Sequence, residues 1–108
     1  YAKKIDKTEG KINWTEEASK ILGQINGLYP NPGAFFNFNG ERYKILKAEI
    51  GNGQGKIGEV LNDKLEIACV DNQAIKILEI QREGKRVQKT SEFMLGSQIK
   101  KGSNISHV

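Results

Sequence analysis

Residues 34–50, AFFNFNGERYKILKAEI, carry the pattern that decides the fold. The apolar run Ala34–Phe38 ends at Asn39-Gly40, and an Asn-Gly pair between two such runs is a strong hairpin signal. The apolar side chains of the next run, Arg42–Ile50, fall into two phases: first Tyr43 and Ile45, then Leu46, Ala48 and Ile50. This slip predicts a β-bulge near 45–46, which would bend the strand sharply, as small barrels require.

Upstream of this hairpin, apolar side chains recur at helical spacing. They are Trp14, Ala18, Ile21, Leu22 and Ile25. The spacing predicts an amphipathic helix over 14–26, with Asn13 or Thr15 as its N-cap and Gly27 at its C-terminal end.

Downstream, short apolar runs alternate with turn residues. The expected strands are Lys56–Leu61, Lys64–Val70, Ala74–Gln81 and Lys85–Gln88, with turns at Asn62-Asp63, Asp71-Asn72 and Glu83-Gly84. The apolar phase slips again at Ile77-Leu78, and Cys69 alternates with other apolar residues, which indicates a buried core thiol. We expect Thr90 or Ser91 to cap a short helical piece that Gly96 ends, followed by a frayed polar tail, 100–108.

One helix followed by about six short strands favours a mainly β fold. We expect a small OB-like Greek-key β-barrel with one N-terminal amphipathic helix and a short C-terminal helical turn, and an SH3-like barrel is the alternative. The polar stretch 1–12 reads as an interdomain linker, and 13–108 as the OB-like domain. Because the chain opens at Tyr1 inside a lysine-rich stretch, we expect it to be a piece cut at a linker.

Composition excludes most enzyme chemistry. The chain has 108 residues, of which 37% are hydrophobic and 28% charged, and no apolar run has the ~20 residues of a membrane span. A single cysteine forms no internal disulfide, so we expect a reducing, cytoplasmic location. With one histidine, His107, a His/Cys metal site and a Ser-His or Cys-His nucleophile are both disfavoured. The carboxylates sit at turns and at a helix start, so we expect no catalytic residue, no metal and no cofactor in this domain.

The basic residues suggest an anionic partner. The formal net charge is +4, and it is concentrated at the two ends of the chain, in 1–12 and 82–102. Arg42, Lys44 and Lys47 point away from the apolar phase, and we expect them to form one outward row with Lys56. A second basic group holds Lys85, Arg86 and Lys89. Since cations spread in this way suit phosphates more than bases, we expect backbone or duplex-shape recognition of RNA.

One ordered series of residues is Tyr1-Ala2-x-Lys4-Ile5-x-Lys7-x-Glu9-x-x-Ile12-x-Trp14-x-x-x-Ala18, then Ile25, Pro30-x-Pro32-Gly33-Ala34, Gly40 and Lys44-Ile45-x-x-Ala48. This series resembles one family, the methionyl-tRNA formyltransferases. The resemblance implies an interdomain linker and a C-terminal OB-like barrel. It also implies an absent N-terminal catalytic domain, which would transfer a formyl group from 10-formyltetrahydrofolate to methionine on initiator tRNA.

The resemblance also implies a tRNA-binding role for matched basic positions. These are Lys4 and Lys7 in the linker and Lys44 in the barrel, to which charge and strand phase add Lys3, Lys11, Arg42, Lys47 and Lys85. The expected partners are initiator methionyl-tRNA and the covalently linked catalytic domain, with no membrane. Two alternatives remain. One is a structural barrel of a related sugar-nucleotide or folate formyltransferase that binds no tRNA, and the other is a protein-interaction barrel with an exposed apolar patch.

Overall fold

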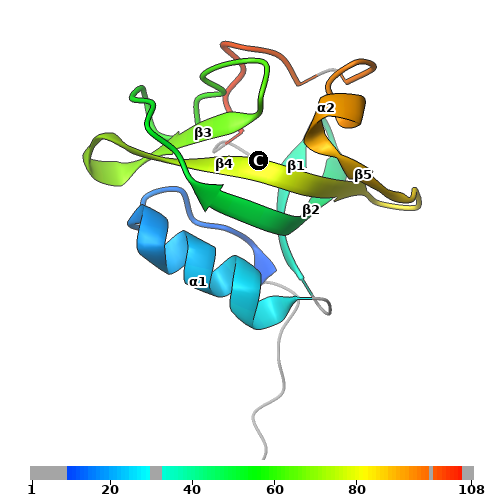
Figure 1. Ribbon diagram of the computed structural model, residues 1–108, viewed down its shortest axis with the longest axis horizontal. Helices are drawn as coiled ribbons and strands as arrows, with labels where there is room; N and C mark the ends of the chain where they lie inside the picture. The colour runs from blue at the N-terminus through cyan, green and yellow to red at the C-terminus, as the bar shows by residue number, and fades with distance from the viewer. Residues whose placement is uncertain (1–9, 30–32, 98, 106–108) are drawn as a thin grey trace, which may run out of the picture.

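A curled antiparallel sheet with one helix beneath it dominates the computed structural model (Figure 1), which describes residues 10–29, 33–97 and 99–105. The elements are α1 (Ala18–Leu28), β1 (Ala34–Phe38), β2 (Glu41–Ile50), β3 (Glu66–Cys69), β4 (Gln73–Arg82), β5 (Val87–Lys89) and α2 (Thr90–Phe93). The five-stranded sheet has the order β1-β2-β4-β3, and β5 pairs with the far end of β4. The mainly β, barrel-like fold with an N-terminal helix and a short C-terminal helical turn confirms the prediction.

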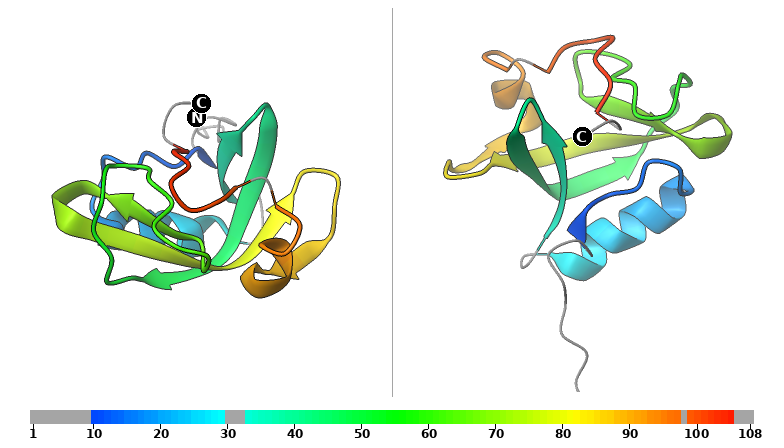
Figure 2. Two further views of the ribbon diagram at one scale, coloured as in Figure 1. Left: turned by 90° about the horizontal axis from the view of Figure 1, so that it is seen from above. Right: turned by 180° about the vertical axis from the view of Figure 1, so that it is seen from behind.

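Both predicted bulges are present, and they bend the sheet. Ile45 pairs with Ile80 and Lys47 with Glu79, so Leu46 is an extra residue in β2. The next pair joins Ala48 to Ile77, so Leu78 is an extra residue in β4. Since bulges increase the local twist, the sheet curls into the half-barrel that Figure 2 shows from above and from behind.

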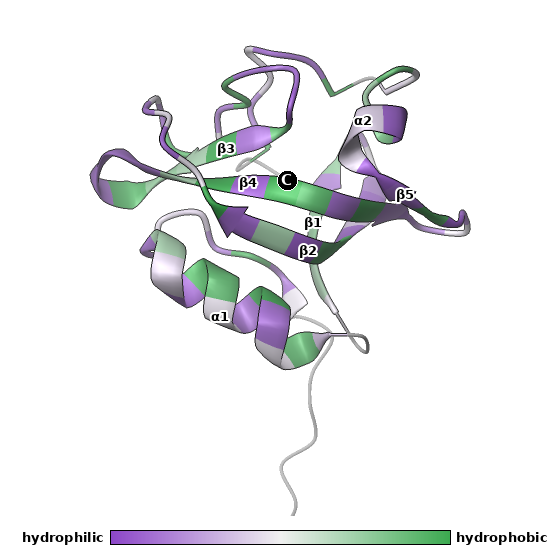
Figure 3. Ribbon diagram, viewed as in Figure 1, coloured by the Kyte–Doolittle hydropathy of each residue, from purple (hydrophilic) through white to green (hydrophobic). Residues whose placement is uncertain are grey.

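One core packs α1 against the sheet and extends to α2 and the C-terminal segment. Figure 3 shows hydrophobic and hydrophilic positions alternating around α1 and along β2. Ile21 and Ile25 of α1 are buried together with Ile45, Ile75 and Ile80 of the sheet. An aromatic chain crosses the core: Phe36 lies 5.3 Å from Tyr43 and Tyr43 lies 5.6 Å from Phe93, measured between ring centroids. The buried thiol of Cys69 belongs to the same core, and burial raises its pKa.

The helix is shorter and later than predicted. It begins at Ala18 rather than at residue 14, because Asn13 Oδ1 accepts hydrogen bonds from the backbone N–H and the hydroxyl of Thr15, at 3.0 and 2.6 Å. That Asx-type turn occupies the chain just before the helix. Trp14 therefore precedes α1, although its ring is still buried against Phe36. Glu17 is the N-cap without a side-chain hydrogen bond, and the helix continues past Gly27 to Leu28, so the predicted caps were wrong.

Two further segments, residues 56–61 and the C-terminal tail, also correct the prediction. Residues 56–61 form only isolated bridges, from Glu59 to Asn104 and from Val60 to Ile67, instead of a strand. Residues 56–61 also pair with the C-terminal tail, which the sequence predicted to be frayed. Ile99 and Ile105 are buried in the core, and the backbone N–H of Ile105 donates to Gly58 at 2.9 Å. These two isoleucines hold 99–105 in place, while 106–108 lie outside the described residues.

The short helix α2 has a different start from the one predicted. Lys89 is its N-cap, and neither Thr90 nor Ser91 caps it. The hydroxyl of Thr90 instead donates to the carbonyl oxygen of Ile77 in β4, at 2.6 Å. This hydrogen bond ties α2 to the sheet at the second bulge.

The N-terminal segment joins the edge of the sheet. Lys11 pairs with Phe35 in a parallel bridge, Ile12 is buried in the core, and its backbone N–H donates to the carbonyl of Phe35 at 2.9 Å. Residues 1–9 of the expected linker lie outside the described residues, so the boundary at residue 12 stays a prediction.

Candidate nucleic-acid interface

The first candidate site lies on the outer face of the β1–β2 hairpin and β4. Phe35 pairs with Lys44 and Lys44 with Gln81, so these three side chains share one face across three strands. The guanidinium of Arg42 lies over the ring of Phe35, with Cζ 4.2 Å from the centroid. We call Phe35, Arg42, Lys44 and Gln81 the hairpin patch. It lines a shallow depression together with Gly33, Glu83 and Gly84.

Glycines give the hairpin patch its shape. Asn39 and Gly40 both have positive φ, 51° and 79°, which is the backbone of a tight type I′ turn and places β2 opposite β1 in this register. Gly33 has φ of 85°, and a Cβ there would lie 2.6 Å from Cδ of Lys44. A Cβ on Gly10 would lie 3.2 Å from the Phe35 ring. Only glycine therefore lets Lys44 and Phe35 lie flat against the neighbouring backbone.

The charge of Arg42 in the hairpin patch is held by an exposed ion pair. Arg42 pairs with Glu83 at 3.8 Å, and both side chains are exposed, at 43% and 69%. An ion pair of this kind contributes only about 0–1 kcal/mol, so a phosphate replaces the carboxylate at little cost. The stacked guanidinium is held in position by the ring, and it carries more N–H donors than the single carboxylate of Glu83 engages.

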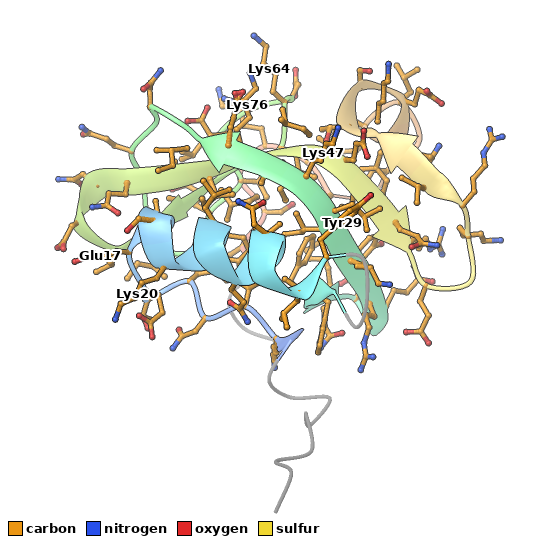
Figure 4. All side chains as sticks on the ribbon, turned by 60° about the horizontal axis from the view of Figure 1, so that its bottom comes forward. Glu17, Lys20, Tyr29, Lys47, Lys64 and Lys76 are labelled. Carbon is orange, nitrogen blue, oxygen red and sulfur yellow. The ribbon has the colours of Figure 1, made fainter. Side chains whose placement is uncertain are left out.

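Lys47, by contrast, lies in a separate depression. It pairs with Glu79 at 3.9 Å and shares the depression with Lys64, Lys76 and Lys89. We call these four residues the lysine groove. Figure 4 shows Lys47, Lys64 and Lys76 on the same side of α1, away from Glu17 and Lys20. The expected single row of Arg42, Lys44, Lys47 and Lys56 is thus divided at the bulge, and Lys56 lines neither depression.

Lys85 lies in a third depression, beyond the end of β4, with Arg82 and Arg86. Its carbonyl oxygen accepts a hydrogen bond from the side-chain amide of Gln81 at 2.8 Å, which links this turn to the hairpin patch. Arg82 makes a two-pronged ion pair with Glu41, and hydrogen bonding to Arg82 lowers the pKa of the Glu41 carboxyl. Arg82 is thus paired with Glu41. Among the described residues, the other two cations of this depression, Lys85 and Arg86, form no ion pair.

The structure therefore brings together some of the basic residues that the sequence predicted to bind tRNA. Arg42 and Lys44 are neighbours, Lys11 lies at the adjacent edge beside Phe35, and Lys47 and Lys85 are in other depressions. Lys3, Lys4 and Lys7 lie outside the described residues. Sequence reasoning did not select Phe35 as a site residue. Because strand side chains alternate, Phe35 and Phe36 lie on opposite faces of β1, although both are buried, and that signal was available.

No catalytic constellation is found in the described part of the chain. Residues 10–29, 33–97 and 99–105 contain no group of three or more His, Cys, Asp or Glu side chains placed to hold a metal ion. Glu66 is the one buried carboxylate in these ranges, and it is occupied by Asn52, Gly53 and Asn62. No helix within the same ranges is long and apolar enough to cross a bilayer.

Comparison with solved structures identifies a protein with the same fold. A solved structure, HypX from Aquifex aeolicus in complex with tetrahydrofolic acid, superposes with a TM-score of 0.70 over 91% of this chain and 19% of that chain, at 19% sequence identity. This likeness shows the shared fold.

Comparison with curated sequences finds relatives of much higher sequence identity. The chain is 61% identical over its whole length to methionyl-tRNA formyltransferase of Pelagibacter ubique, and 44% identical over 98% of its length to that of Bradyrhizobium diazoefficiens. It spans 35% of the length of each relative. The family model for the formyl transferase C-terminal domain matches residues 4–98. The chain belongs to the family of formyl transferase C-terminal domains.

Proposed function

We propose that this chain is the tRNA-binding C-terminal domain of a cytoplasmic methionyl-tRNA formyltransferase. The proposal is carried by the high identity to two enzymes of that name. In it, the remainder of the enzyme transfers a formyl group from 10-formyltetrahydrofolate to methionine on initiator tRNA. This domain binds neither the folate nor the methionine, and it holds the RNA.

The hairpin patch supports an RNA-binding role on physical grounds. Arg42 and Lys44 offer two cations on one outer face of the sheet, and Gln81 adds an amide beside them. Guanidinium and ammonium groups bind phosphate oxygens without reading sequence, which suits a domain that positions a substrate. In the proposal Lys11 extends this contact, and Lys3, Lys4, Lys7, Lys47 and Lys85 supply further phosphate contacts.

The benefit of such a domain is kinetic. A weak RNA-binding module joined to a catalytic domain raises the local concentration of the substrate end near the reacting centre. Electrostatic attraction also speeds the encounter without needing a tight complex. Modest affinity for many tRNAs is therefore compatible with the proposal.

The test is a fluorescence anisotropy titration of the chain with labelled tRNA at several salt concentrations. Each lost phosphate contact reduces the slope of log K against log[salt] by about 0.7–0.9, so R42Q/K44Q should lower the slope by about 1.5 and weaken binding at low salt. K100Q/K101Q removes the same charge from two exposed tail lysines and serves as the matched control. A wild-type chain that binds no tRNA at low salt would refute the proposal and favour a purely structural barrel.

A further inference from the structure

The lysine groove contains a second concentration of positive charge, apart from the hairpin patch. Its lysines come from β2, the turn before β3, β4 and β5, so four separate segments deliver one charge each. Asp63 and Glu79 are the acidic residues in its lining, and four lysines against two acids leave a net charge of +2. Lys64, Lys76 and Lys89 make no ion pair within 4.0 Å with any residue that the structure describes, although Glu49 and Glu66 are the cross-strand neighbours of Lys76.

The strand register fixes how far apart these cations lie. Lys47 and Lys89 both pair with Glu79, from the two sides of β4, so they are two strand spacings or about 10 Å apart at the backbone. Lys76 precedes Glu79 by three residues on β4, roughly 10 Å along the strand. The backbone positions of these lysines are therefore distributed over a surface and are not gathered on one segment.

This spacing favours one of two kinds of anionic ligand. A single phosphate would have to draw several long side chains from backbone positions about 10 Å apart to one centre. A polynucleotide backbone places charges at repeated intervals and is matched by separated lysines on an open groove. Ser91, also in the lining, adds a neutral hydroxyl of the kind that contacts phosphate oxygens.

We propose that the lysine groove binds a second stretch of RNA sugar–phosphate backbone, separate from the stretch held by the hairpin patch. This inference rests on the proposed function and extends it to a bipartite RNA interface. Glu79 acts within it as an internal competitor, since its carboxylate pairs with Lys47 in the free protein. The RNA must displace that carboxylate to use all four lysines.

The first arm of the test removes the three lysines without an ion pair. The triple variant K64Q/K76Q/K89Q is titrated with labelled tRNA over a range of salt concentrations, beside a control, K20Q/K100Q/K101Q, with the same loss of charge. The groove variant should lower the salt slope by about 2 and weaken low-salt binding by about tenfold or more, while the control lowers both much less. Thermal unfolding shows whether both variants keep the fold.

The second arm is a gain of binding. E79Q removes the competing carboxylate and should tighten tRNA binding and steepen the salt slope by about 1, because Lys47 then contributes fully. Equal slopes for the groove triple and the control triple, or unchanged binding by E79Q, overturn the inference. If R42Q/K44Q still weakens binding in that case, the proposed function stands. If the wild-type chain binds no tRNA, both proposals are refuted.

Discussion

Replacing Glu66 by Gln tests how one carboxylate organises the glycine-rich loop 51–55. Oε2 of Glu66 accepts the backbone N–H groups of Asn52 and Gly53 at 2.8 and 2.6 Å, and Oε1 accepts the side-chain amide of Asn62 at 2.9 Å. The side chain of Glu66 is the anchor that holds this loop against β3.

The expected loss of unfolding free energy in E66Q follows from these hydrogen bonds. A glutamine has one acceptor oxygen, and if that oxygen serves the two backbone N–H groups, its NH₂ group meets the NH₂ group of Asn62. Asn62 does not simply flip, because its Oδ1 already accepts the backbone N–H of Lys64 at 2.9 Å. One hydrogen bond is lost and two lose their charge assistance, which we expect to lower the free energy of unfolding by about 3 kcal/mol. For a domain of this size the melting temperature should fall by roughly 10–20 °C.

The effect of Glu66 should depend on pH in a defined direction. Burial raises the pKa of Glu66, but hydrogen bonds from Gly53, Asn62 and Asn52 and the nearby charge of Lys76 outweigh it, so the pKa lies below its ordinary 4.5. A lowered folded-state pKa contributes stability that is present above pH 4.5 and is lost as the pH falls through the folded value. The stability difference between wild type and E66Q should therefore be full at neutral pH and should narrow in acid.

The assay is urea unfolding followed by circular dichroism, from neutral pH down to about pH 3, where carboxylate linkage is expressed. E49Q, which changes an exposed carboxylate on β2, is the control and should be nearly neutral. The reasoning is wrong if E66Q is as stable as wild type at neutral pH, or if the difference between them stays constant down to pH 3.

Three further predictions follow from single contacts. Gly33→Ala should cost about 1–2 kcal/mol, because φ is 85° and the new Cβ collides with Lys44, and it should also weaken tRNA binding in the anisotropy titration. Thr90→Val removes the hydroxyl that donates to Ile77 and should lower stability to urea by about 1–2 kcal/mol; unchanged stability would contradict that role. Cys69 is 2% exposed and burial raises its pKa, so a thiol reagent should label it only as fast as the chain unfolds, and rapid labelling of the native chain would count against the core assignment.

Much of the sheet could be predicted because its signals are local. The Asn39-Gly40 turn and the phase slips at 45–46 and 77–78 are all visible within a few residues of sequence, and all are present. The helix start was missed because Trp14 fits the helical period, while the Asn13 side chain closes a turn around it. Periodicity alone does not distinguish a helical position from a buried residue just before a helix.

The remaining differences arise from contacts between distant parts of the chain. Nothing local in 56–61 shows that its partner is the tail, whose Ile105 donates to Gly58. For the candidate site, strand phase correctly placed Arg42 and Lys44 together, because they lie two residues apart on one strand. The groove lysines come from four separate segments, so only the pairing of strands shows that they meet.

The paired bulges connect the fold to the charge distribution. Leu46 shifts the register between β2 and β4 by one residue, and Leu78 shifts it back, so pairing on both sides of Lys47–Glu79 follows the same register. Each extra residue also reverses which side chains of its own strand face the core. If Leu46 were paired as a regular strand residue, the alternation from Tyr43 and Ile45 would turn Lys47 inward, and if Leu78 were paired in that way, the alternation from Ile80 would turn Lys76 inward. A single bulge would leave one strand with its lysine against the core, so the lysine groove depends on both bulges.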